Sequence, residues 1–225
     1  DIITFLTYFP DDISDELWEI FPMIYVAFDQ WAFDYLNLMV PPLENYIGKA
    51  PQAFMSKSAV IDNVNVSYVN LVVSIVSKTL QEDRASESEA RKALSLYMSL
   101  LLNCKGMLDS YLPMINDHVL TFMGKQAAAE TPTTRIALFV VLAAALYYNP
   151  ELELAELEKR GITQQLLTQW IKDSEQMDRW LPRKISVIGL CSVLQMPTAT
   201  LPQSVGNMIP QILALITDLT GQIEE

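Results

Sequence analysis

The sequence predicts an all-α fold built from consecutive antiparallel helix pairs, and three observations support this prediction. Apolar residues recur at three- and four-residue spacing along nearly the whole chain, as in Val69, Val73 and Val76. Short linkers separate these stripes, and proline, serine or asparagine marks the helix ends. The expected helices are 15–28, 33–49, 65–82, 87–104, 108–123, 132–148, 150–160, 164–176, 182–195 and 203–222.

Proline recurs between apolar residues inside or near these helices. The copies are Phe21-Pro22-Met23-Ile24, Leu112-Pro113-Met114-Ile115 and Ile209-Pro210-Gln211-Ile212, with a looser copy at Val40-Pro41-Pro42-Leu43. A proline inside a helix costs about 3 kcal/mol unless a bend is wanted there. Repeated bends in helix pairs of about 40 residues fit the HEAT class of repeats. We therefore expect an α-α superhelix (a HEAT-repeat solenoid) of about five antiparallel helix pairs, with residues 1–225 as a single segment. A helical bundle is the alternative.

The longest apolar run, 136–148, contains no charged residue and no turn former. It is shorter than the roughly 20 residues that a membrane-spanning helix needs, and it lies mid-chain, unlike a secretory signal. Thr131-Pro132 can begin its helix as an N-cap followed by proline at the first helical position. The run is therefore expected to form a buried helix of a soluble protein.

Helix ends are marked by residues that satisfy backbone groups. Ser86 with Glu89 fits a capping box, in which each side chain bonds a backbone donor of the other residue. Pro150 disfavours helical geometry at Asn149, so the helix before it stops, and Asn149 can then cap the next helix. Gly161 can terminate that next helix. These signals predict a corner between two helices at Asn149-Pro150.

One stretch, Asn63 to Tyr68, alternates polar and apolar residues with period two. This alternation is typical of a strand. The longer helical stripe that follows it favours a helix over 65–82 instead.

The chain of 225 residues has a formal net charge of −12, from 27 acidic and 15 basic residues. A surface this negative repels nucleic acid and anionic membranes, and it favours basic partners. Cys104 and Cys191 both lie among apolar neighbours, so we expect buried thiols in a reducing compartment rather than a disulfide.

The stretch Asp11-Asp12-Ile13-Ser14-Asp15 matches the D-D-x-x-D motif of all-α prenyl-transfer enzymes, where carboxylates hold magnesium. The second acidic motif of such enzymes is incomplete at Asn116-Asp117. Because the stretch precedes a helix, we favour a Ser14 cap flanked by acids at the positive helix end.

Other catalytic signals are weak. His118 is the single histidine, neither cysteine has a paired ligand spacing, and no glycine-rich phosphate loop appears. The four tryptophans, Trp18, Trp31, Trp170 and Trp180, are interpreted as core residues. We therefore expect no enzyme activity, no metal and no cofactor.

Three stretches carry a family resemblance: Glu16 to Ile47, Ala143 to Leu152, and Thr168 to Leu194. Their order and spacing resemble the C-terminal half of β-karyopherins, in particular the subgroup of importin-seven, importin-eight and fungal relatives. The resemblance implies a HEAT-repeat superhelix from a nuclear transport receptor that moves between cytoplasm and nucleus. It also implies basic cargoes such as ribosomal proteins or histones, nucleoporins with phenylalanine-glycine repeats, and Ran-GTP bound through N-terminal repeats absent here. The chain is expected to be a C-terminal fragment.

Two acidic clusters are candidate contacts for basic cargo, and solvation of helix faces is the alternative role. A HEAT-repeat scaffold of a multiprotein complex is the alternative function. The candidate residues are Asp11, Asp12, Asp15, Glu16 and Glu19 in the first cluster, and Glu151, Glu153, Glu156 and Glu158 in the second.

Overall fold

Helices account for most of the residues that the structure, a computed structural model, describes, namely 2–82, 85–125 and 131–224. The all-α prediction is confirmed. The chain divides into two compact units, Asp1–Met107 and Leu108–Glu225. The expectation of a single solenoid segment over 1–225 stays a prediction.

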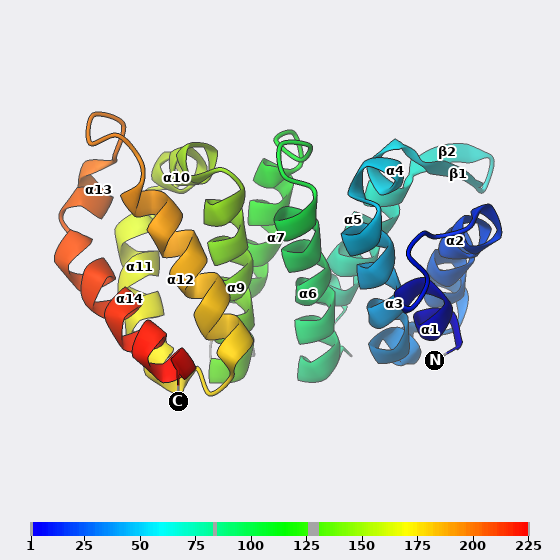
Figure 1. The fold of residues 1–225 in the computed structure, drawn as a ribbon, viewed down its shortest axis with the longest axis horizontal. Coiled ribbons are helices and arrows are strands. Elements are labelled where there is room, and N and C mark those ends of the chain that lie inside the picture. The colour runs from blue at the N-terminus through cyan, green and yellow to red at the C-terminus, as the bar shows by residue number, and fades with distance from the viewer. Residues whose placement is uncertain (1, 83–84, 126–130, 225) are drawn as a thin grey trace. The chain divides into compact units, whose positions relative to one another are not determined.

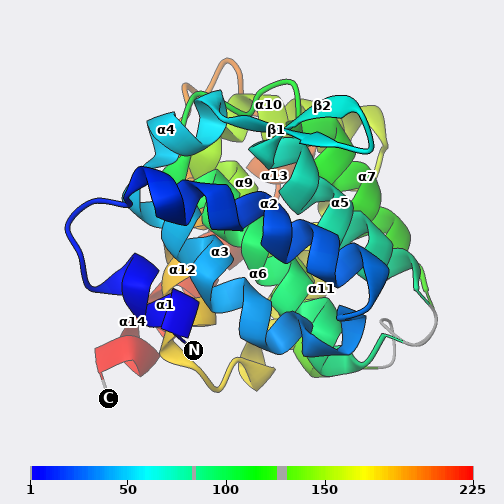
Figure 2. The same ribbon diagram turned by 90° about the vertical axis from the view of Figure 1, so that its right-hand side faces the viewer.

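The first unit combines helices with one short hairpin (Figures 1 and 2). Within it, α3 lies against both α1 and α6, while α5 lies against α6 and α2. Its elements are α1 (Ile2–Tyr8), α2 (Asp15–Gln30), the 3-10 helix η1 (Phe33–Tyr35), α3 (Leu36–Lys49), α4 (Pro51–Ser56), β1 (Ser58–Ile61), β2 (Val64–Ser67), α5 (Tyr68–Gln81) and α6 (Glu87–Asn103).

An aromatic cluster forms part of the core of the first unit. Phe21 of α2 stacks on Tyr68 of α5 with ring centroids 4.3 Å apart, and it meets the edges of Tyr46 and Phe54. Tyr68 also donates a hydrogen bond from its hydroxyl to the Trp18 carbonyl at 2.9 Å. Large aromatic side chains contribute much of the apolar area that a core buries. The cluster therefore fixes α2, α3, α4 and α5 to one another.

The hairpin of β1 and β2 corrects the prediction that a helix begins at residue 65. Its strands pair antiparallel with Ile61 opposite Val64, so Asp62 and Asn63 form the two-residue loop. Both loop residues have positive φ, as a type I′ turn requires, and asparagine and aspartate tolerate this conformation best after glycine. The helix starts only at Tyr68, where the Ser67 hydroxyl accepts from the Asn70 N–H at 3.2 Å. The alternation of period two was thus the correct signal.

The second unit is organised around α9, which contacts α7, α10, α11 and α12. In Figure 1, α12 crosses α9 diagonally, and α14 lies on the other side of α12. The elements are α7 (Leu112–Met123), α9 (Pro132–Tyr148), α10 (Pro150–Lys159), α11 (Thr163–Asp173), the 3-10 helix η2 (Ser174–Gln176), α12 (Trp180–Leu194), α13 (Gln203–Gly206) and α14 (Ile209–Glu224).

Two expected helices of the second unit are shorter than predicted, and proline explains both differences. The helix expected over 108–123 begins at Leu112, and the one expected over 203–222 is split into α13 and α14. Because proline lacks an N–H, it fits the first turn of a helix best, although Pro22 of α2 and Pro41 and Pro42 of α3 stand inside their helices. Pro113 and Pro210 therefore each stand in the first turn of α7 and α14.

The apolar run 136–148 forms most of α9 and is buried on nearly all sides. The prediction of a buried helix is confirmed. Phe139 is fully buried and stacks on Trp170 of α11 with ring centroids 5.6 Å apart. Among the helices of the described residues, none has both the length and the hydropathy to cross a membrane.

The crossing of α9 and α12 is close because a glycine lies at the contact. A Cβ atom added to Gly189 would stand 2.3 Å from the backbone oxygen of Ala143 and 2.9 Å from its carbonyl carbon. A real Cβ does not approach backbone atoms so closely. The absence of a side chain at Gly189 thus sets the distance between the two central helices of this unit.

The predicted helix ends at Ser86 and Asn149 are confirmed. Ser86 and Glu89 form the complete capping box of α6, with Ser86 N–H donating to Glu89 Oε2 at 2.7 Å. Asn149 Oδ1 accepts from the Leu152 N–H at 3.1 Å and so caps α10. Gly161, with a φ of 68°, follows α10 as expected.

Replacing Asn149 by alanine is expected to lower the free energy of unfolding by about 1 kcal/mol, since the Leu152 N–H loses its capping acceptor. The loss is measured by urea unfolding of the 225-residue chain. Asn149→Asp keeps an acceptor at the same position and should stay close to the wild type. An equal loss in both variants would contradict a capping role.

Candidate functional site

The first acidic cluster lies on the surface where α1 passes into α2. Asp11 and Asp12 lie in the loop between the two helices, which extends outward in Figure 2, and Asp15, Glu16 and Glu19 lie in the first turns of α2. All five side chains are exposed. The Ser14 hydroxyl accepts from the Leu17 N–H at 3.4 Å, which confirms the predicted cap. Carboxylates are favoured here because the N-terminal end of a helix is partially positive.

The contacts of these five carboxylates are few. Within the described ranges, none of the five forms an ion pair with a lysine or arginine. The Glu16 carboxylate accepts hydrogen bonds from its own backbone and from Ser14, and these lower its pKa. The nearby Lys49 instead donates from Nζ to the backbone carbonyls of Tyr8 and Pro10. The cluster is therefore a negative surface without a direct ion pair among the described residues.

Exposed aromatic side chains on α1 and just after it precede this cluster in the sequence. Phe5 and Phe9 stack with ring centroids 5.7 Å apart, and Tyr8 meets Phe9 edge-on at 5.3 Å. All three are more than half exposed. Asn45 of α3 fixes α1 in place by donating from Nδ2 to Thr4 O at 3.2 Å and to Thr7 Oγ1 at 3.0 Å. We call Phe5, Tyr8, Phe9, Asp11, Asp12, Asp15, Glu16 and Glu19 together the acidic–aromatic corner.

The second acidic cluster is not a uniform surface. Glu151 and Glu158 are exposed, although Glu158 Oε1 accepts a hydrogen bond from Ser204 at 2.5 Å. Glu156 is half-buried and lies 3.7 Å from Nη2 of Arg160. Glu153 is 0% exposed. The expectation that Glu153 lies on an exposed face is therefore corrected, because the face of α10 that carries it packs inside the second unit.

The burial of Glu153 follows from a residue far away in the sequence. Asn116 of α7 is also fully buried and donates from Nδ2 to Glu153 Oε2 at 2.8 Å. Burial raises the pKa of Glu153 to about 7. A helix pattern alone did not reveal this partner, since α7 and α10 meet only through the fold of the second unit.

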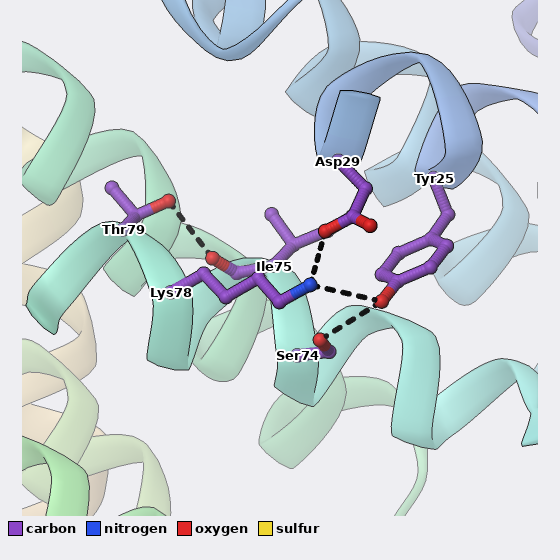
Figure 3. Close-up of polar contacts among 6 residues, drawn as sticks. All are labelled: Tyr25, Asp29, Ser74, Ile75, Lys78 and Thr79. Atoms are coloured by element: carbon purple, nitrogen blue, oxygen red, sulfur yellow. Dashed lines mark hydrogen bonds and ion pairs between the residues drawn. The ribbon is translucent and has the colours of Figure 1, made fainter. Parts of the chain in front are cut away.

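A third group of polar residues links α2 to α5 and is structural (Figure 3). Lys78 forms an ion pair with Asp29, and its Nζ donates to the Tyr25 hydroxyl at 3.4 Å. The same hydroxyl lies 3.2 Å from Ser74 Oγ. Asp29 is thus compensated, unlike the carboxylates of the acidic–aromatic corner.

Comparison with known proteins decides the family. A family model described as "Importin-11-like, TPR repeats" matches residues 3–225. The chain belongs to the importin family. The helix pairs of this importin segment agree with that description, since TPR and HEAT repeats are both stacked helix pairs.

Individual relatives of this importin segment support the expected subgroup. Importin-8 of Danio rerio is 29% identical over 92% of the chain and 20% of its own length. The probable importin-7 homolog of Dictyostelium discoideum is 27% identical over 86% of the chain and 18% of its length. The importin beta-like SAD2 homolog of Arabidopsis thaliana is 24% identical over 97% of the chain and 21% of its own length. The chain thus spans about a fifth of these relatives, and no solved structure matches it.

The residues considered for catalysis in this importin segment are the acids at 11, 12 and 15, His118 and the two cysteines. Among the residues that the structure describes, no group of three histidine, cysteine, aspartate or glutamate side chains could hold a metal ion. His118 is half-buried, and burial lowers its pKa. Cys104 is buried, and burial raises the pKa of its thiol to about 11, whereas Cys191 is half-buried.

The tryptophan prediction is half correct. Trp18 and Trp170 are core residues, but Trp31 and Trp180 are 74% and 61% exposed. Both exposed residues stand at helix ends, at the C-cap of α2 and the first position of α12. A helical stripe continues to a helix end in the sequence, whereas the neighbouring helix that would cover it does not always reach that far.

Proposed function

We propose that this importin segment is part of a nuclear import receptor and that its acidic–aromatic corner binds basic segments of cargo such as ribosomal proteins or histones. One observation carries the proposal: five exposed carboxylates lie close together in the sequence, and none forms an ion pair with a lysine or arginine within the described residues. The net charge of −12 extends the same attraction over the chain.

The corner offers two complementary contacts to a cationic side chain. Exposed single ion pairs contribute only about 0–1 kcal/mol each, so binding needs several at once. The rings of Phe5, Tyr8 and Phe9 add contacts for a guanidinium group, which stacks on aromatic faces and pairs with carboxylates in a bidentate way. An arginine-rich segment therefore suits this surface better than a lysine-rich one.

The remaining parts of the proposal concern the whole receptor. Shuttling between cytoplasm and nucleus requires contacts to nucleoporins, and the exposed Trp31, Tyr35 and Leu38 offer apolar surface to their phenylalanine-glycine repeats. Ran-GTP would bind repeats other than those in this chain. The single 225-residue segment would then serve as a cargo-contacting part of the receptor.

Neutralising the corner is expected to weaken binding of an arginine-rich histone-tail peptide at low salt. Asp11→Asn with Asp12→Asn should reduce affinity about fivefold, from two exposed charges of about 0.5 kcal/mol each. Asp15 and Glu16 stay unchanged, because they stabilise the N-terminal end of α2. Fluorescence anisotropy of the labelled peptide measures the affinity at about 50 mM and about 150 mM salt, where screening differs.

A matched pair of substitutions separates a local site from net charge. Glu151→Gln with Glu158→Gln removes the same charge from the second cluster and is expected to change affinity less than twofold. If both double variants weaken binding equally, only the net charge acts and the corner is not a site. Wild-type affinity in the corner variant, or affinity that ignores salt, would also overturn the proposal.

A further inference from the structure

A carboxyl group and an amide meet in the interior of the second unit, at the contact of α7 with α10. Glu153 and Asn116 are both 0% exposed. Asn116 Nδ2 donates to Glu153 Oε2 at 2.8 Å. The hydrogen bond joins two residues 37 positions apart and is shielded from water. Neither residue belongs to the acidic–aromatic corner, so this inference stands apart from the proposed function.

The other polar atom of each group, the second carboxyl oxygen of Glu153 and the amide oxygen of Asn116, is an acceptor without a donor among the described residues. Among the described residues, Glu153 Oε1 and Asn116 Oδ1 are both buried and have no hydrogen-bond partner. An ionised carboxylate only accepts hydrogen bonds, and an amide oxygen does the same. Two acceptors cannot satisfy each other, and buried unsatisfied acceptors are strongly disfavoured.

One proton satisfies both atoms. We propose that Glu153 is protonated in the folded protein and donates from Oε1 to Asn116 Oδ1, so that acid and amide close a ring of two hydrogen bonds between α7 and α10. A carboxylic acid and a primary amide each present one donor beside one acceptor, so the ring is complementary. A single proton in this ring gives both buried oxygens, Glu153 Oε1 and Asn116 Oδ1, a hydrogen-bond partner.

Charges near Glu153 agree with a neutral acid. Burial is the largest effect and raises the pKa of Glu153 to about 7. The Asn116 hydrogen bond lowers it, Glu156 raises it and Arg160 lowers it.

The cation beside Glu153 is directed to other partners. Arg160 Nη1 lies 2.7 Å from Asp117 Oδ1, and Nη2 lies 3.7 Å from Glu156 Oε2. On α7, His118 follows Asp117 and has a pKa that burial lowers, so the imidazole is neutral near pH 7. Arg160 Nε is buried and has no hydrogen-bond partner among the described residues, so neither a hydrogen bond nor an ion pair joins Arg160 to Glu153 within that part of the chain.

The sign of the pH dependence follows from the raised pKa. Between the unfolded value of 4.5 and the folded value of about 7, the folded state binds one proton more than the unfolded state. The protonated Glu153 therefore stabilises the folded state fully below pH 4.5, and this stabilisation is lost as the pH rises through about 7. Opening of the α7–α10 contact should become more favourable by on the order of 10²-fold between pH 5 and 8.

Hydrogen exchange of the 225-residue chain tests this local opening. After correction for intrinsic exchange rates, amides of α7 and α10 should lose protection in the wild type by that factor between pH 5 and 8. Glu153→Gln should keep its protection, because an amide at 153 donates to Asn116 Oδ1 at every pH. Glu156→Gln, on the same helix, should retain the wild-type pH dependence.

An infrared measurement provides a second readout of the proton. A protonated carboxyl band is expected at pH 6 in the wild type and in Glu156→Gln, and it should be absent from Glu153→Gln. If Glu153→Gln does not fold, Asn116→Ser should instead shift the wild-type band, since the acid loses its acceptor. The proposal is overturned if Glu153→Gln keeps the wild-type pH dependence, or if neither variant alters a carboxyl band at pH 6. A buried water beside an ionised Glu153 would produce that second result.

Discussion

Truncating Phe139 to alanine is expected to lower the free energy of unfolding by about 3–5 kcal/mol. Phe139 lies in the middle of α9, is 0% exposed and stacks nearly parallel on the indole of Trp170. Removing the ring loses its buried apolar area and leaves a void that α11 cannot close without moving. Loss of the stacking adds to this destabilisation, since an aromatic pair contributes about 0.5–1.5 kcal/mol of stability beyond that of its buried area.

The same substitution at an exposed ring is the control. Phe5 is 60% exposed, so Phe5→Ala should change stability by less than about 0.5 kcal/mol. Urea unfolding followed by circular dichroism compares both variants with the wild type. Equal and small effects at the two positions would mean that α9 is not the core of its unit.

Replacing Gly189 by alanine is expected to destabilise the second unit by about 3 kcal/mol or more, the upper range for overpacking. An alanine in a helix is normally more favourable than glycine by about 0.5–1 kcal/mol, so local propensity predicts the opposite sign. The close contact decides the sign, because the new methyl group would stand 2.3 Å from the Ala143 oxygen. Relief requires α9 and α12 to move apart along the contact at the centre of this unit.

Gly221 of α14 offers a matched control. A Cβ added there meets nothing within 4 Å, so Gly221→Ala should be neutral or more stable by about 0.4–1 kcal/mol. Thermal unfolding of the two variants distinguishes the effects. A neutral or stabilising Gly189→Ala would show that the two helices tolerate a wider separation.

The helix ends at Ser86 and Asn149 were predictable because the deciding interaction is local. The Ser86 box and the Asn149 cap each involve residues three positions apart, so the sequence contains both partners. The starts of α7 and α14 were misplaced, although proline favours the first turn of a helix, where Pro113 and Pro210 stand. Despite this preference of proline, the apolar stripes on either side of each proline suggested one continuous helix.

The hairpin at 58–67 was missed because the longer helical stripe that follows it favoured a helix from residue 65. Asn-Gly and Asp-Gly are the usual two-residue turns, whereas Asp62-Asn63 adopts positive φ without glycine. Ala59 and Ile61 are half-buried, while Val60 and Val64 are exposed, so the strands carry little of the apolar pattern of a core. The helix that follows the hairpin begins at Tyr68, three residues later than predicted.

Exposure of the acidic residues was predictable only in part. Asp11 and Asp12 lie in a loop, where local sequence already implies exposure. Glu153 stands among other acids on a helix and looked solvated, yet its surroundings depend on Asn116, 37 residues earlier. A long-range contact of this kind leaves no periodic signal, so the buried acid became visible only in the folded chain.

The contact at Gly189 also constrains which sequences this fold can accept. The atoms that exclude a side chain there are the oxygen, carbonyl carbon and Cα of Ala143, all of them main-chain atoms that every amino acid possesses. No exchange at position 143, not even to glycine, can make room for a larger residue at 189. Two contacting positions often change together through a compensating pair of substitutions, but no such pair is possible at this crossing. Glycine at 189 is therefore required for as long as α9 and α12 keep their spacing.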